Sequence, residues 1–168
     1  MSEDPSWLPA LILLNEFDGD WSNYVNAIYE RFQHDLLTNQ PKYAGKWVRC
    51  RRDPIYDGKY AGFWHCVSEG NDEAHRTPDL RRCERIGWVR AVIVNADSAL
   101  EIDSWKNERQ GEIRNLLWFR EEYLVVLAER TRKHDGFQYF QLITAYQTPE
   151  ESRKRKLRAE RDCRTING

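Results

Sequence analysis

The sequence lacks a long hydrophobic run. None of its 168 residues lies in a stretch approaching the roughly 18 apolar residues that a membrane-spanning helix needs. Its first residues, MSEDPSW, carry acidic side chains where a secretory signal peptide carries basic ones, and no suitable apolar segment follows them. We therefore expect a cytoplasmic protein that does not interact with membranes.

Closely spaced cysteines and nucleotide-binding motifs are also missing. The 4 cysteines form no CxxC pair, so reduced thiols are expected rather than a disulfide framework. His65, Cys66, His75 and Cys83 are conceivable zinc ligands, but they do not show the paired spacing usual for structural zinc sites. The patterns GxxxxGKS/T, GxGxxG and GxSxG are absent as well. We expect neither a metal nor a cofactor.

Basic residues are absent from the first thirty positions, although the net charge of the chain is only −1. Lys and Arg outnumber Asp and Glu in segments 42–90 and 150–164. Such segments form either a solvated surface with salt bridges or a face that binds a polyanion. The sequence leaves both interpretations open.

The first half of the chain predicts one clear helix and several short elements. Asp20 is a suitable N-cap, and Asn39 with Pro41 ends the helix. Its apolar stripe recurs at steps of three and four residues: Trp21, Tyr24, Val25, Ile28, Tyr29, Phe32 and Leu36. Residues 8–14 form a first strand or an extended lead-in. Short strands are expected at 46–51 and 62–67, and one or two helical turns at 78–85.

The second half predicts an antiparallel meander. Strands are expected at 88–94, 102–107, 115–119, 123–130 and 137–146. Segment 123–130 is apolar on both faces and should be central, and Asp135-Gly136 indicates a hairpin after it. Thr148 and Glu151 resemble a capping box with Pro149 at the first helical position, which predicts a basic C-terminal helix.

These elements predict a single α+β domain over residues 1–168. N-terminal helix or helices should pack on the antiparallel meander, and the C-terminal basic helix should follow. The parts expected are a helical segment at 1–45, an irregular strand and turn region at 46–85, the sheet at 86–147 and the helix at 148–163.

Side chains suited to metal-free RNA cleavage occur along the predicted sheet. Cleavage at the 2′-hydroxyl needs an acid, a base and cations that stabilise the charged phosphorane. Candidate catalytic residues are His65, Arg130, Thr144 and Tyr146. Candidate RNA- or phosphate-binding residues are Arg76, Arg85, Arg90 and Lys106. Each also has a structural alternative, such as a satisfied histidine, a core aromatic residue or a surface ion pair.

The segments RIGWVRAVIVNAD, YLVVLAER and FQYFQLITAYQTPEESRKRKLRAER carry a resemblance that covers residues 85–161. They resemble the RelE-like, barnase/EndoU/colicin (BECR) superfamily of toxin and prophage nuclease domains. That resemblance implies helices packed on a four- or five-stranded antiparallel sheet and metal-independent RNA cleavage on its concave face. By position it implies site roles for Arg130, Thr144 and Tyr146, whereas His65 and Lys106 rest on their chemistry alone.

The chain departs from some branches of that superfamily, because it lacks a paired-histidine signature upstream of the sheet. The resemblance therefore does not designate the general base, and three hypotheses stay open. The first is a metal-independent endoribonuclease that binds RNA and has an antitoxin or immunity protein as partner. The second is a non-enzymatic module that binds nucleic acid or protein. The third is a structural domain that self-associates through exposed aromatic residues.

Overall fold

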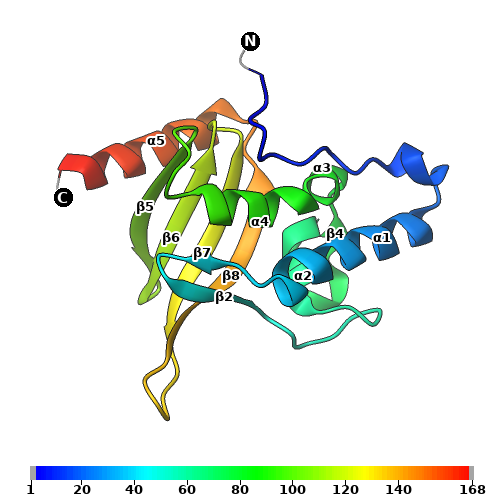
Figure 1. Ribbon diagram of the computed structural model, residues 1–168, viewed down its shortest axis with the longest axis horizontal. Helices are drawn as coiled ribbons and strands as arrows, with labels where there is room; N and C mark the ends of the chain where they lie inside the picture. Colours follow the sequence, from blue (N-terminus) through cyan, green and yellow to red (C-terminus); the bar gives the residue numbers. More distant parts are fainter. Residues whose placement is uncertain (1–2, 167–168) are drawn as a thin grey trace.

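The computed structural model describes the backbone of residues 3–166 and the side chains of residues 3–163 (Figure 1). Within that range the chain forms an α+β fold around a six-stranded sheet of order β1-β2-β8-β7-β6-β5. The strands of this sheet are β1 (Lys42–Tyr43), β2 (Lys46–Cys50), β5 (Ile102–Arg109), β6 (Glu112–Phe119), β7 (Tyr123–Thr131) and β8 (Gln138–Gln147). The helices are α1 (Trp21–Gln33), α2 (Ala61–Val67), α3 (Leu80–Glu84), α4 (Ile86–Asn95) and α5 (Glu151–Ile166). Shorter helical elements are η1 (Leu14–Phe17), η2 (His34–Thr38) and η3 (Glu73–His75). A small second sheet consists of β3 (Ser68–Glu69) and β4 (Thr77–Pro78).

The predicted N-terminal helix is confirmed. The Asp20 carboxylate accepts a hydrogen bond from the Asn23 amide at 3.0 Å, which satisfies a free donor at the start of α1. Tyr24, Ile28 and Phe32 are fully buried in the main hydrophobic core, as the three- and four-residue spacing requires. Residues 8–13 form no strand, so the extended lead-in is the correct alternative.

The predicted meander is confirmed for strands β5 to β8, which pair antiparallel in sequence order. β7 lies between β6 and β8 and is buried on both faces from Tyr123 to Ala128. The sheet continues past β8, because β2 pairs with β8 in parallel and β1 pairs antiparallel with β2. This parallel neighbour was not predicted, since nothing local in the sequence indicates pairing between strands that are so far apart.

Two predicted strands are wrong. Residues 62–67 lie in helix α2 and residues 88–94 lie in helix α4. In α2, Phe63, Cys66 and Val67 are buried at helical spacing, and α4 is buried on most of its surface. A helix that is apolar nearly all round has the same short-range pattern as a buried strand, so periodicity could not separate the two.

The predicted capping box at Thr148 is also wrong. Helix α5 begins at Glu151, two residues after Pro149. The buried Thr148 hydroxyl instead donates to the Glu121 carbonyl at 3.0 Å and accepts from the Trp118 indole N–H at 3.0 Å. A tertiary hydrogen bond therefore replaces the local cap that the sequence suggested.

The helices cover the two faces of the sheet unequally (Figure 1). α1, α2 and α4 pack against one face and form the larger core, which includes Val89, Leu117 and Val125. On the opposite face, Leu157 of α5 packs with a smaller cluster that includes Trp118. No helix within residues 3–166 combines the length and apolarity that crossing a bilayer requires.

Candidate functional site

Part of the sheet face that carries α5 displays polar and basic side chains. Arg49 of β2 pairs with Gln141 of β8, Gln141 pairs with Ala128 of β7, and Ala128 pairs with Arg114 of β6. Directly paired residues lie side by side on one face of a sheet. The register thus places the basic and amide side chains of Arg49, Gln141 and Arg114 in one row, with the small Ala128 of β7 between the last two.

An irregularity in β8 determines which of its side chains point to this face. Val126 pairs with Thr144 but the next residue of β7, Leu127, pairs with Leu142, so Ile143 is an extra residue. Such a bulge changes the alternation of side chains along a strand. It allows Gln141 before the bulge and Tyr146 after it to share one face.

Although Phe63, Cys66 and Val67 of α2 pack in the larger core, His65 of the same helix reaches the side chains of this face. Its backbone is held against β8 by the Thr144 hydroxyl, which donates to the His65 carbonyl at 2.9 Å. At the start of α2, the Gly62 amide donates to the Arg51 carbonyl at 2.8 Å. A Cβ atom on Gly62 would lie 2.9 Å from that same carbonyl oxygen, so glycine permits the close approach of α2 to Arg51.

Replacing Gly62 with alanine is expected to lower the free energy of unfolding by about 1–2 kcal/mol. Overpacking against a backbone atom costs about 1–3 kcal/mol, which outweighs the better helix propensity of alanine. Urea unfolding measures this difference. Gly87→Ala is the matched control, because a Cβ there meets the flexible Arg31 side chain and Pro9 rather than backbone, at 3.2 Å or more. An equal or larger loss in Gly87→Ala would contradict the explanation.

His65 and three arginines line one small depression of about 170 Å³, here called the His65 depression. Its charged and polar lining residues come from the segment directly after β2 and from α2, β6, β7 and β8: Arg51, His65, Glu112, Arg114, Arg130 and Gln141. Two of the four predicted catalytic residues, His65 and Arg130, therefore meet in one place. A third, Thr144, supports the backbone of His65 through its hydroxyl.

The imidazole of His65 is held by a carboxylate. Its Nε2 lies 2.6 Å from Oε1 of Glu73, which belongs to η3. Burial lowers the pKa of His65 from its ordinary value, the hydrogen bond to Glu73 opposes that change, and the positive charge of Arg76 adds to the lowering. A neutral imidazole oriented by a carboxylate is suited to accept a proton near neutral pH.

The arginines of the His65 depression share few acidic partners. Arg130 donates to Gln141 Oε1 at 3.0 Å and lies 3.0 Å from Glu112. Arg114 lies 3.4 Å from the same carboxylate, and its buried Nε has no hydrogen-bond partner within the described residues. Arg51 lies 3.7 Å from Glu73. Two carboxylates for three guanidinium groups leave a positive excess, which favours an anionic ligand.

Tyr146 and Arg76 lie beside this depression without lining it. The Tyr146 hydroxyl accepts a hydrogen bond from Arg153 at 2.6 Å, and the Arg82 guanidinium lies 5.2 Å from its ring centre. Those three side chains line a separate depression next to the start of α5. Arg76 donates to Ser68 Oγ and to the Ser68 carbonyl, at 2.9 and 2.7 Å, and so fixes the turn between α2 and η3.

The other predicted phosphate-binding residues are not brought to this face. Arg85 bonds to the Arg81 carbonyl and lies over Trp88. Arg90 of α4 donates to the Asn39 carbonyl at 3.1 Å. Lys106 pairs with Glu129 at 2.8 Å, and Glu129 points to the opposite face from its neighbour Arg130.

Sequence reasoning missed Arg51, Glu73, Glu112 and Arg114. Arg51 and Glu73 stand in turn-rich segments, where a single sequence contains no indication of which residue a loop brings inward. Glu112 and Arg114 lie on the same face of β6, which begins at Glu112. The predicted strand began only at residue 115, so the alternation of side chains that would have indicated this pair was not considered.

The chain matches no protein-family model, no curated protein and no solved structure. The likeness of residues 85–161 to the BECR superfamily consequently rests on the sequence segments alone. Among the residues that the structure describes, no three His, Cys, Asp or Glu side chains gather in a group that could hold a metal ion.

Proposed function

We propose that this chain is a metal-independent endoribonuclease of the toxin or prophage type, distantly related to the BECR superfamily. The observation that carries the proposal is the meeting of the carboxylate-held His65 imidazole with Arg51, Arg114 and Arg130 around one depression. A base and several cations are the groups that RNA cleavage at the 2′-hydroxyl needs. An acidic antitoxin or immunity protein would be the matching inhibitor.

The proposed reaction is an intramolecular transesterification. His65 accepts the proton of a ribose 2′-hydroxyl, and the 2′-oxygen attacks the adjacent phosphorus. The bond from phosphorus to the 5′-oxygen breaks, water protonates the leaving oxygen, and a 2′,3′-cyclic phosphate remains. The guanidinium groups stabilise the negative charge that develops on the phosphorane oxygens. Glu73 orients the imidazole and stabilises it when it carries the proton.

A non-enzymatic RNA-binding module is the second candidate. The salt bridges of Arg114 and Arg130 to Glu112 favour it, because a carboxylate so close offsets part of the charge available to a phosphorane. Such a module would bind RNA through the same face with a strong dependence on salt and would leave the strand intact.

Incubation of the purified chain with single-stranded RNA in excess EDTA tests the proposal. We expect fragments that end in a 2′,3′-cyclic phosphate, and no cleavage where a single 2′-deoxyribose replaces the ribose at the cleaved position. Mass spectrometry of the products measures both results. Salt-sensitive binding of intact RNA, without cleavage in either EDTA or added divalent cations, would instead support the binding module.

A further inference from the structure

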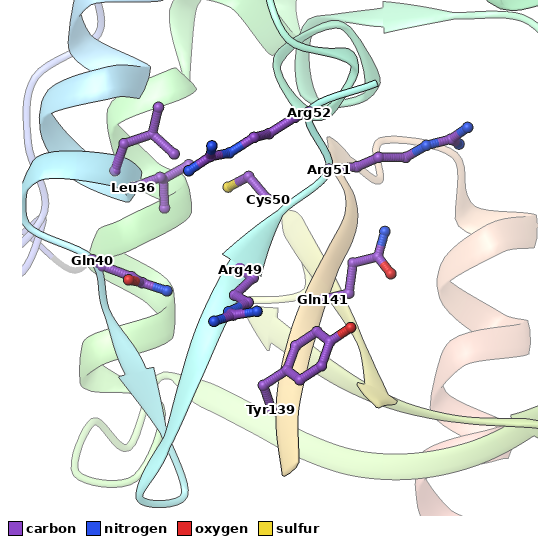
Figure 2. A pocket seen from close by; sticks show the side chains of 9 residues that line it. Leu36, Gln40, Arg49, Cys50, Arg51, Arg52, Tyr139 and Gln141 are labelled. Carbon is purple, nitrogen blue, oxygen red and sulfur yellow. The ribbon is translucent and has the colours of Figure 1, made fainter. Parts of the chain in front are cut away.

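A second and larger depression adjoins the His65 depression. Its volume is about 470 Å³, it is lined by Arg49, Arg51 and Arg52, and none of the described residues that line it is acidic. We call it the arginine depression. Figure 2 shows Arg49, Tyr139 and Gln141 extending from the neighbouring strands β2 and β8, whereas Arg51 and Arg52 extend in opposite directions. Three guanidinium groups without a lining carboxylate favour a ligand with several negative charges.

Two of these arginines, Arg49 and Arg52, have no acidic partner in the part of the chain that the structure describes. Within residues 3–163 no carboxylate lies at salt-bridge distance from Arg49 or Arg52, although both are exposed. Both guanidinium groups instead lie over aromatic rings: Arg49 lies 5.0 Å from the ring centre of Tyr139, and Arg52 lies 5.7 Å from that of Tyr60. Arg130 and Arg132, in contrast, pair with Glu112 and Asp135. The charge of Arg49 and Arg52 is therefore available to phosphate groups.

An aromatic platform accompanies the unpaired charge. The rings of Phe137 and Tyr139 are stacked, with centres 6.2 Å apart and planes 21° from parallel. Arg49 lies over both of them. Unpaired bases bind proteins by stacking on aromatic rings and on arginine planes, whereas bases inside a duplex are not accessible in this way.

The arginine depression is continuous with the His65 depression. Arg51 and Gln141 line both. Gln141 pairs directly with Arg49 of β2, and Tyr139, two residues earlier on β8, pairs with Arg130 of β7. A strand that leaves the neighbourhood of His65 past Gln141 would thus meet Arg49 and Tyr139 next.

We propose that the arginine depression binds the nucleotides of a single-stranded RNA that flank the segment at His65. This inference rests on the proposed function and adds the substrate class: an unpaired strand that extends several nucleotides beyond the cleaved bond. Phosphates contact Arg49 and Arg52, and one base stacks at Tyr139. Dinucleotides do not reach this subsite, and duplex RNA does not offer a base to it.

Binding of 2′-O-methyl oligonucleotides, which are not cleaved at the 2′-position, tests the inference. The double variant Arg49→Ala, Arg52→Ala should bind a single-stranded hexanucleotide about tenfold more weakly than the original chain. The slope of log K against log salt should also become shallower by about 1.4, because each of the two lost phosphate contacts contributes about 0.7 to it. Tyr139→Leu should weaken the hexanucleotide but keep the salt slope, because it removes stacking alone. Fluorescence anisotropy measures each affinity.

Arg155→Ala, Lys156→Ala is the matched control, since it removes two positive charges from exposed positions of α5. It should bind the hexanucleotide as the original chain does. Equal losses in the two double variants, unchanged hexanucleotide affinity in the Arg49/Arg52 variant, or tighter binding of a duplex than of the single strand would each overturn the inference. Hexanucleotide binding that depends on Arg49 and Arg52, in a chain that never cleaves RNA, would refute the nuclease proposal and leave this subsite intact.

Discussion

Replacing His65 with glutamine is expected to slow RNA cleavage by about 100- to 10,000-fold, the range that a positioned general base contributes. Glutamine retains a donor that can reach Glu73, so the hydrogen bond that holds this side chain in the folded protein can be kept. It has no group that accepts a proton at neutral pH. The cleavage rate should therefore fall while the thermal midpoint and the affinity for 2′-O-methyl RNA change little.

The pH dependence of cleavage supplies an independent readout. Burial lowers the pKa of His65 below its ordinary value, and only the neutral imidazole accepts a proton. The rate should rise with pH through a pKa lower than that of a solvent-exposed histidine and be level at neutral pH. The same lowered pKa means that the unfolded chain binds the proton more tightly, so the contribution of His65 to stability should be lost as the pH falls through this range.

His134→Gln is the matched control for His65→Gln. His134 lies in the turn between β7 and β8, where its side chain is 73% exposed, and it lines neither depression. Cleavage by this variant should equal that of the original chain. Full activity in His65→Gln, or an equal loss in His134→Gln, would remove His65 from the proposed reaction. Loss of activity with a much lower thermal midpoint would assign His65 a structural role instead.

Replacing Trp118 with alanine is expected to lower the free energy of unfolding by about 3–5 kcal/mol, the cost usual for deleting a fully buried aromatic side chain. Trp118 is 0% exposed and lies in the cluster between the sheet and α5. It packs edge-on against Trp105 with ring centres 6.0 Å apart and donates to the Thr148 hydroxyl. Its removal leaves a cavity and also deprives Thr148 of a donor. Urea unfolding followed by circular dichroism measures the change.

Trp47→Ala is the control for this prediction. Trp47 is 40% exposed on β2 and has Lys42 over its ring at 4.4 Å, so its loss should cost less than about 1 kcal/mol. Trp118→Phe should cost less than Trp118→Ala, because phenylalanine fills much of the space while losing the hydrogen bond. A loss below about 1 kcal/mol in Trp118→Ala would contradict the tight packing of this face.

Local patterns were sufficient for α1 and for β5 to β8. Asp20 caps the helix, and the stripe that includes Ile28 and Phe32 faces the core, because both features depend on residues close together in the chain. They were insufficient for α2 and α4, because a short, mostly apolar segment fits a buried strand as well as a helix. Thr148 shows the same limit for a cap, since its hydroxyl bonds to residues 27 and 30 positions away.

The candidate site was predictable only in part, for a related reason. His65 and Arg130 stood out by their chemistry, and the structure places both around one depression. Lys106 was chosen on the same grounds, but it lies on the other face of the sheet, where it pairs with Glu129. Arg51 and Glu73 could not be chosen from the sequence. Arg51 lies in the segment after β2 and Glu73 begins η3, and only the folded chain brings the two side chains together near His65.

By itself, the sequence determined the α+β class, the first helix, the antiparallel meander and its central strand β7, since hydrophobic periodicity and turn residues encode these locally. Only the tertiary structure decided the parallel pairing of β2 with β8 and the docking of α2 beside Arg51. Both depend on contacts between distant segments, which are selected by how well whole surfaces pack rather than by any short pattern. The position of His65 among its arginines follows from those two contacts.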